Sequence, residues 1–139
     1  MTLDENIAIV RRYYESVASG RDLAVADEIL ATDCLIHEPQ QQLRGTTDLK
    51  RRLEAFLVAF PDLECSMDDA IAQGEKVATR YTVRGTHRGP FAGAAPTGNQ
   101  ITMGGMMIFR LADGRIQEAW GCADLLGFRR QLNPSPTAE

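Results

Sequence analysis

Residues 108–132 read IFRLADGRIQEAWGCADLLGFRRQL, and this stretch decides the fold. Two segments in which apolar and polar residues alternate flank Asp113-Gly114, a dipeptide typical of a tight β-hairpin turn. The second segment ends at Cys122, and residues 125–132 then have the apolar spacing of a short helix. The stretch therefore predicts a hairpin of two strands followed by a C-terminal helix.

The chain before this hairpin has the same alternating pattern. Residues 63–72 and 76–86 are predicted as two strands joined by a tight turn, because apolar and polar side chains alternate along both. Residues 101–111 form the next predicted strand, in which Gly104-Gly105 indicates a bulge or a bend. Between these strands, residues 89–98 (GPFAGAAPTG) have no periodicity and are predicted as a flexible loop at the rim of the sheet.

The N-terminus has helical spacing instead. Thr2 and Glu5 are placed to form a capping box, and Gly20 is expected to end the helix in a left-handed conformation. The apolar residues between them recur every three or four positions, which indicates one buried helical stripe. These residues are Ile7, Val10, Tyr14 and Val17.

Two further helices are predicted before the run of strands. Asp22 is placed to cap a short second helix. A short strand within residues 33–39 and a loop at 40–45 follow it. The third helix is expected to start at Thr46 or Thr47, and Pro61 helps to stop it.

Helices followed by hairpin-connected strands predict an α+β protein. The expected architecture is a conical half-barrel, in which a curved antiparallel sheet packs on the N-terminal helices and its concave face lines an apolar pocket. One domain is expected over residues 1–133, with a disordered tail at 134–139.

Composition limits the classes of function. The net charge of −4 and the scattered basic residues argue against a nucleic-acid partner. No apolar run is long enough to span a membrane, and the acidic N-terminus has no features of a signal peptide, so a cytoplasmic protein is expected. Three cysteines without C-x-x-C spacing, and two histidines fifty residues apart, favour neither a disulfide framework nor a metal site.

Several short motifs occur in a characteristic order along the chain. They are VRRYYESVASGR (10–21), DCLIHEP (33–39), AFPDLE (59–64), GEKVATRYTVRGTHRGPFAG (74–93), PTG (96–98) and the stretch at 108–132. These motifs and the order of elements resemble the SnoaL-like polyketide cyclase group of the nuclear-transport-factor-2-like superfamily. The resemblance implies a cone-shaped α+β barrel, a homodimer and a small apolar molecule in the pocket. Described cyclases of the group close a ring by intramolecular aldol condensation without metal or organic cofactor, whereas other members of the superfamily isomerise ketosteroids, hydrate epoxides or bind ligands.

Asp124 is the first candidate for chemistry. The resemblance places the group's acid/base aspartate in a W-x-x-x-D motif, which here is WGCAD at 120–124, so Asp124 takes that role. A carboxylate inside an apolar cone has a raised pKa and becomes a better acid or base near neutral pH. Asp124 also directly precedes a predicted helix, so the alternative interpretation is an ordinary N-cap.

The donor that polarises the substrate is less clearly indicated. A histidine that such cyclases often carry on the preceding strand is replaced here by Met107, whose thioether cannot transfer a proton. His37 and Arg80 lie on predicted strands and are the candidates for this role. For each of them the alternative interpretation is a side chain on the solvent side of the sheet.

Other residues are expected to line the pocket. His87 ends its strand at a Gly-Pro loop, which predicts a position at the rim, where it could touch a ligand. Met107 and the neighbouring methionines suit a pliable apolar lining, although core packing would explain them equally well. The other predicted substrate-binding residues are Trp120, Tyr81 and Tyr14.

Two functions of different class remain open. The first is a cofactor-independent enzyme that acts on an apolar, ketone-bearing substrate with Asp124 as acid and base. The second is a non-catalytic ligand-binding member of the fold, which Met107 at the histidine position favours. An isomerase or an epoxide hydrolase is a further alternative, and for the hydrolase Asp124 and Arg80 would supply part of the acid–arginine set.

Overall fold

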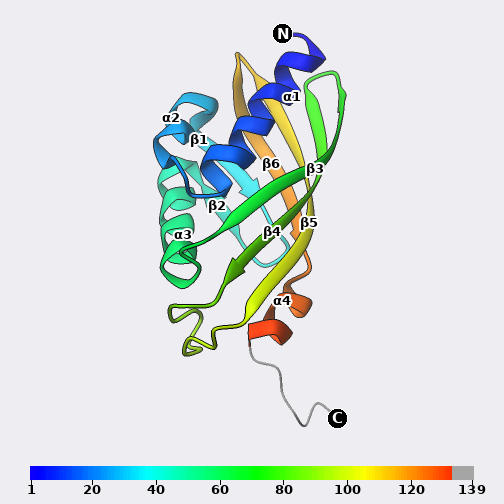
Figure 1. The fold of residues 1–139 in the computed structure, drawn as a ribbon. Coiled ribbons are helices and arrows are strands. Elements are labelled where there is room, and N and C mark those ends of the chain that lie inside the picture. Colours follow the sequence, from blue (N-terminus) through cyan, green and yellow to red (C-terminus); the bar gives the residue numbers. More distant parts are fainter. Residues whose placement is uncertain (133–139) are drawn as a thin grey trace.

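The computed structural model describes residues 1–132. One curved, unclosed sheet forms its body, with strand order β2-β1-β6-β5-β4-β3, and α1 crosses one face of the sheet (Figure 1). Helix α3 lies beside β1, and α4 lies beside β5 at one end of the sheet. The elements are α1 (Leu3–Arg12), η1 (Tyr13–Ala18), η2 (Leu23–Val25), α2 (Ala26–Ile29), β1 (Leu30–His37), β2 (Gln42–Arg44), α3 (Gly45–Ala59), β3 (Glu64–Gln73), β4 (Lys76–Thr86), β5 (Gln100–Ala112), β6 (Arg115–Ala123) and α4 (Leu125–Leu132).

The sheet topology follows the prediction from β3 onward and departs from it at β1. Strands β3 to β6 pair as successive antiparallel neighbours. β1 pairs in parallel with β6, and the short β2 pairs with β1 at the edge. The prediction of an antiparallel sheet is therefore wrong at β1. The prediction of a loop at 40–45 is also wrong, because this segment contains β2. The parallel pair joins segments that are distant in sequence, so neither a turn nor a local pattern marks it.

The first helix begins and ends as predicted but changes its geometry on the way. Thr2 Oγ1 accepts a hydrogen bond from Glu5 N, and Glu5 Oε1 accepts one from Thr2 N, which confirms the capping box. Gly20 follows the last turn with a φ of 75°. Residues of η1 are π-helical, and within this stretch Tyr13 and Tyr14 are both buried. Widened turns of this kind are often found at functional sites.

The later elements agree closely with the sequence pattern. β4 and α4 have the predicted bounds, and positive φ angles at Asp113 and Gly114 confirm the hairpin turn. Of the bulge or bend predicted at Gly104-Gly105, the bulge is absent, because the pair is matched to β4 without a register shift. The irregularity in the pairing of β5 lies instead between Arg110 and Leu111, opposite β6.

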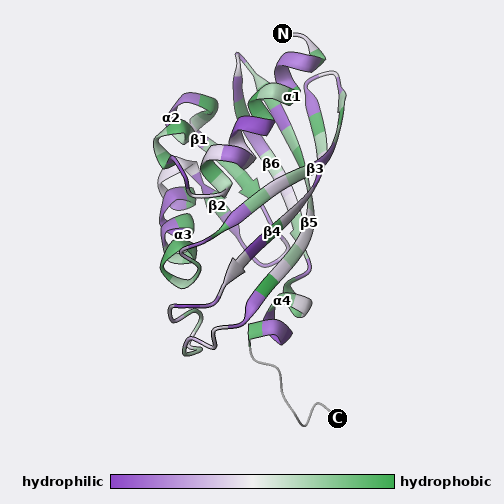
Figure 2. Cartoon of the chain, in the orientation of Figure 1, coloured by the Kyte–Doolittle hydropathy of each residue, from purple (hydrophilic) through white to green (hydrophobic). Residues whose placement is uncertain are grey.

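Two cores hold the fold together. Apolar and polar residues alternate along the long strands (Figure 2), and the apolar face packs against α1 and η1 in a first core around Tyr14, Phe109 and Ile116. The second core lies near α4 and contains four phenylalanines in mutual contact. They are Phe56, Phe60, Phe91 and Phe128.

The segment between β4 and β5 has a defined conformation, in place of the flexible rim loop that the composition predicted. Arg88 N and Gly89 N both donate hydrogen bonds to Ala59 O, which ties the start of the segment to the end of α3. Phe91 inserts its ring into the second core. Aromatic packing and backbone hydrogen bonds therefore hold a stretch that has no periodicity of its own.

No helix within residues 1–132 has the length and apolarity that crossing a membrane requires. The three cysteines are free thiols, in agreement with the expectation of no disulfide framework. The tail predicted at 134–139 lies outside the described residues.

Candidate active site

The face of the sheet on which a side chain lies decides whether it can reach the interior. Along β4, β5 and β6, side chains alternate between an inner face, which packs toward the helices, and an outer face. The inner face carries Thr79, Tyr81, Gly105 and Met107, and the outer face carries Arg80, Met106, Ile108 and Trp120.

Asp124 lies at the junction of β6 and α4. Its Oδ1 accepts a hydrogen bond from Gly127 N at 2.9 Å, so the carboxylate caps α4 and is exposed rather than enclosed in an apolar cavity. Its backbone N–H donates to Gly104 O at 3.0 Å, which places Asp124 beside the Gly104-Gly105 pair. The N-cap interpretation is confirmed, and the acid/base role stays a prediction.

His37 lies on the outer face, so it does not reach into the cone from β1. Gln42 Nε2 donates to His37 Nδ1 at 2.9 Å, and His37 Nε2 donates in turn to Glu118 Oε2 at 2.6 Å. Arg110 also donates to Glu118. The hydrogen bond from His37, despite the opposing effect of burial, lowers the pKa of Glu118. Both ring nitrogens of His37 are therefore occupied by protein partners.

Arg80 is likewise on the outer face, where its side chain is 54% exposed and lies 3.8 Å from Asp68. The solvent-side interpretation is the correct one, because its neighbours Thr79 and Tyr81 take the inner positions of β4. Arg80 and Asp124 are not brought together. The acid–arginine set of an epoxide hydrolase is therefore not assembled from these two residues.

Trp120 was expected to form a pocket wall or part of the core, and this prediction was wrong. Its ring is partly exposed on the outer face, where it stacks on His37 with ring centroids 5.6 Å apart. Lys76 Nζ lies 5.5 Å from the centroid of the indole ring, a cation–π contact. Trp120 thus belongs to the exposed surface of β6.

His87 is fully buried, which corrects the expectation of a position at the rim. The segment after β4 folds back along His87 through backbone hydrogen bonds, and the His87 ring lies beside that of Phe60, with centroids 5.6 Å apart. Thr97 N donates to His87 Nδ1 at 3.3 Å, so Nδ1 is the acceptor and Nε2 carries the proton. Nε2 is the one fully buried side-chain nitrogen or oxygen within residues 1–132 that has no hydrogen-bond partner.

Tyr14 and Met107 lie on the inner side, as their predicted place in the pocket requires. The Tyr14 hydroxyl lies 2.7 Å from Thr79 Oγ1, and Thr79 donates to Met107 O at 3.2 Å. Because the Thr79 proton is used in that bond, Tyr14 is the donor to Thr79. The hydroxyl of Tyr14 is thus committed to the protein, and burial strongly raises its pKa.

Tyr81 also lies on the inner face, and its environment contains an ion pair that the sequence did not indicate. Arg52 of α3 donates to both carboxylate oxygens of Glu38, at 2.5 and 2.6 Å. Burial alone would lower the pKa of Arg52, but the hydrogen bonds and charge of Glu38 raise it. Burial also raises the pKa of Tyr81 to about 12, and the charges of Glu38 and Arg52 act on its hydroxyl in opposite directions.

Two signals could have located this pair. Glu38 is two residues from the buried Ile36, so strand alternation places both on the inner side. Arg52 follows Leu49 by three residues, which puts it next to the buried stripe of α3. The Arg-Arg-Leu-Glu run at 51–54 suggests scattered surface charge instead, because residues 51 and 54 are exposed.

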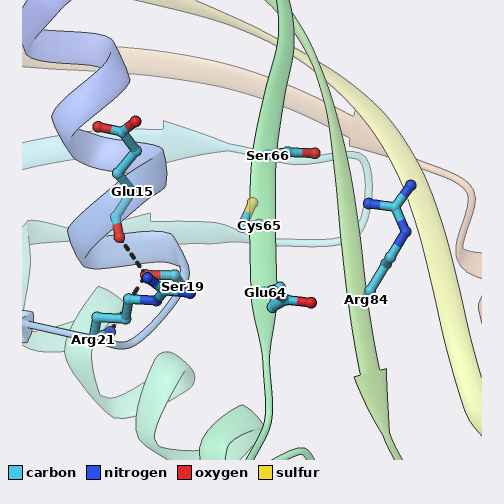
Figure 3. A pocket seen from close by; sticks show the side chains of 7 residues that line it. All are labelled: Glu15, Ser19, Arg21, Glu64, Cys65, Ser66 and Arg84. Carbon is cyan, nitrogen blue, oxygen red and sulfur yellow. Dashed lines mark hydrogen bonds between the residues drawn. The ribbon is translucent and has the colours of Figure 1, made fainter.

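A separate depression of about 420 Å³ lies at the edge of the sheet, where the start of β3 passes the end of η1 (Figure 3). Its side chains do not converge, since Ser66 and Arg84 extend away from the side on which Glu15 and Ser19 lie. None of the predicted site residues lines it. The lining residues are Glu15, Ser19, Arg21, Glu64, Cys65, Ser66 and Arg84.

Metal ligands do not gather in the part of the chain that the structure describes. There, no three side chains of histidine, cysteine, aspartate or glutamate lie close enough to hold an ion. The acids and bases at hand are the carboxylate of Asp124 at the end of β6 and the hydroxyl groups on the inner face. Such a set can move a proton and donate a hydrogen bond to an oxygen.

The curved sheet wrapped on N-terminal helices defines an α+β protein of the nuclear-transport-factor-2-like class, and solved structures share this fold. AclR from Streptomyces galilaeus, a candidate hydroxylase, superposes with a TM-score of 0.85 at 25% identity, over 97% of this chain and 85% of that one. IdmH from Streptomyces antibioticus, a candidate polyketide cyclase, gives 0.81 at 29% identity, over 91% and 97%.

Sequence comparison gives the family. The model of the SnoaL-like polyketide cyclases matches residues 8–132, and the chain belongs to that family. Aklanonic acid methyl ester cyclase DnrD from Streptomyces peucetius is 28% identical over 144 residues, which cover 99% of this chain and 97% of that protein. The enzyme DauD from Streptomyces sp. (strain C5), with the same activity in its name, is also 28% identical, over 99% of this chain and 88% of that protein.

Proposed function

We propose that the protein is a cyclase that closes a ring in an apolar, ketone-bearing polyketide by an intramolecular aldol reaction. The observation that carries the proposal is the match over nearly the whole chain to a cyclase family and to cyclases of named activity. The fold alone supports only the scaffold, since one scaffold hosts unrelated reactions.

In the proposed reaction the protein has to supply only proton transfers, because the substrate itself provides both carbon atoms of the new bond. A base removes a proton from the carbon beside one carbonyl group, and the resulting enolate carbon attacks a second carbonyl carbon of the same molecule. A carbon–carbon bond forms, and the new alkoxide takes up a proton. Substrate and product have the same composition, so the reaction involves no net oxidation or reduction.

Asp124 is the residue that we assign to these proton transfers. It occupies the aspartate position of the W-x-x-x-D motif, at the end of β6 beside Gly104-Gly105. Its exposed carboxylate uses Oδ1 to cap α4, and Oδ2 accepts no hydrogen bond from residues 1–132. One oxygen of the carboxylate thus stays available to a substrate that enters from this end of the sheet.

Ligand binding without catalysis is the second candidate. It is favoured by two observations, the apolar Met107 at the position of the family histidine and the structural use of Asp124 as an N-cap. Under this proposal the same interior would hold a polyketide and release it unchanged.

Incubation with aklanonic acid methyl ester separates the two candidates. A cyclase converts the ester into a product of identical mass but different chromatographic retention, and one carbonyl signal disappears from its ¹³C spectrum. A binding protein binds the ester, as measured by calorimetry or equilibrium dialysis, yet returns it unchanged. Binding with complete recovery of the ester after many hours would favour the second candidate.

We also propose that a second copy of the chain covers the outer face of the sheet. Four large apolar side chains are exposed there, and they form the outer patch: Ile71 (70%), Met106 (63%), Ile108 (43%) and Trp120 (37%). Some charged groups around the outer patch are paired within the chain, as Arg80 is with Asp68 and His37 with Glu118. An apolar patch can be buried against the same patch of a second copy, as in a two-fold interface.

Met106→Glu is expected to weaken this dimer at least tenfold, because an unpaired carboxylate would be buried in the interface. Light scattering coupled to size exclusion measures the mass as a function of protein concentration. Val58→Glu is the matched control, since Val58 is 64% exposed on α3, away from the outer patch. A wild-type mass equal to one chain, or equal dissociation of both variants, would contradict the proposed interface.

A further inference from the structure

The phenol groups near the interior differ in how their oxygens are used. Tyr14 donates to Thr79, whereas the hydroxyl of Tyr81 makes no hydrogen bond with any residue in 1–132. Within the same residues only His87 Nε2 is both fully buried and without a partner. The Tyr81 oxygen is therefore reached by solvent even though its side chain lies on the inner face. A donor in this state is free to bind a ligand oxygen.

Gly105 makes the room for this hydroxyl. Tyr81 pairs with Gly105 across β4 and β5, and a Cβ atom at position 105 would overlap the hydroxyl and ring of Tyr81. The phenol ring of Tyr81 thus occupies the space that a side chain at position 105 of β5 would fill. Asp124 is attached to the adjacent Gly104 through its backbone N–H. The sheet register therefore brings the backbones of both residues to this glycine pair, with Tyr81 opposite Gly105 and Asp124 next to Gly104.

Tyr81 is also close to Met107, the position at which related cyclases often carry a histidine. Met107 lies two residues beyond Gly105 on the same face of β5, diagonal to Tyr81. Diagonal neighbours in an antiparallel pair are within reach of an aromatic side chain. A phenol at Tyr81 can therefore present a proton to much the same part of the interior as a side chain at position 107.

We propose that Tyr81 is the donor that polarises the ketone of the substrate, in the place of the histidine that Met107 replaces. The geometry that carries this is the inward-facing hydroxyl over Gly105, which has no hydrogen-bond partner within residues 1–132. The role of Tyr81 in catalysis rests on the proposed cyclase function, whereas its hydrogen bond to a bound ketone does not, because the hydroxyl can donate to any apolar ketone. The oxygen receives a hydrogen bond in the ground state and a stronger one as charge develops on enolisation.

Electrostatics around the phenol favour a neutral carbonyl oxygen as the ligand. The pKa of Tyr81 is raised to about 12, chiefly by burial, so the hydroxyl keeps its proton at neutral pH. Arg52 and Glu38 lie near it but neutralise each other through two hydrogen bonds. No unbalanced positive charge draws a fixed anion to the site, and a ketone oxygen suits a neutral O–H donor.

The infrared spectrum of bound 9-fluorenone tests this assignment without depending on turnover. This ketone has one carbonyl group and an apolar three-ring body, and it has no acidic C–H bond beside the carbonyl. We expect its carbonyl stretch to lie at lower wavenumber in the wild-type protein than in Tyr81→Phe. With the cyclase substrate, the same variant should lose about 100-fold in kcat, the usual effect of removing one such donor.

Gly105→Ala is the second variant, because it keeps the phenol but displaces its hydroxyl. It should shift the carbonyl stretch in the same direction as Tyr81→Phe. The melting temperature of Tyr81→Phe should match the wild type, since the lost hydroxyl has no protein partner. Equal carbonyl frequencies in wild type and Tyr81→Phe, or no binding of 9-fluorenone by the wild type, would overturn the assignment. If the wild type does not turn over the cyclase substrate but the carbonyl stretch still differs between wild type and Tyr81→Phe, only the proposed cyclase function would be contradicted.

Discussion

Asp124→Asn is expected to lower kcat for ring closure by about 1,000-fold, the usual range for the loss of a general acid–base group. The amide cannot accept the proton from carbon, but it has nearly the same shape as the carboxylate. Asn caps helices as well as Asp does, so its side-chain oxygen can still accept the hydrogen bond from Gly127 N. Rates of product formation and the melting temperature should be measured on the same sample.

Asp124→Ala provides the matched comparison. It removes the base and the cap together, so it should lose activity to the same degree and about 1 kcal/mol of stability in addition. If Asp124 is only a helix cap, Asp124→Asn should keep wild-type activity, and Asp124→Ala should lose activity only in proportion to its lower stability. Wild-type activity in the Asn variant would therefore leave Asp124 as an N-cap only.

Phe60→Ala is expected to destabilise the fold by about 3–5 kcal/mol, as large-to-small changes of buried aromatic residues do. Phe60 is fully buried, and its ring lies 5.7 Å from that of Phe91 and 5.8 Å from that of Phe128. These two rings belong to the segment after β4 and to α4. Loss of Phe60 thus removes part of the aromatic contact that joins the end of α3 to both, and Phe56 supplies the rest.

Urea unfolding followed by circular dichroism measures this loss as a shift of the midpoint. Val58→Ala, two residues earlier on the exposed side of α3, is the control and should change stability by less than about 0.5 kcal/mol. Similar midpoints for Phe60→Ala and the wild type would show that the second core contributes little to the stability of the fold.

Local patterns account for most of the fold. The capping box at Thr2, the hairpin turn at Asp113-Gly114 and the bounds of β4 and α4 all depend on residues close in sequence, and all were predicted. The parallel pairing of β1 with β6 was not, because it depends on a register between distant segments. The π-helical turn at Tyr13 depends on packing that no spacing rule reports.

The site was less predictable, because its residues are defined by the direction in which they point. His37 and Arg80 were candidates for an inward-facing donor, with a solvent-side position as the alternative for each. A strand directs alternate side chains to opposite faces, and both residues lie outside. His87 ends a strand beside a Gly-Pro break that looked like a rim, but the segment after it folds back and buries the ring. The Arg52–Glu38 pair joins a helix to the end of a strand, and neither residue is unusual in its local sequence.

The rate of ring closure tests the central claim, that this family member removes a proton next to a ketone through Asp124. The measurement is the rate of product formation from aklanonic acid methyl ester by wild type and Asp124→Asn at equal concentration, in water and in deuterium oxide after the protons beside the ketone have exchanged. We predict that the wild type closes the ring and does so more slowly in deuterium oxide, because a C–D bond is then broken, and that Asp124→Asn gives only the uncatalysed rate. Equal rates of product formation with both proteins would contradict the claim.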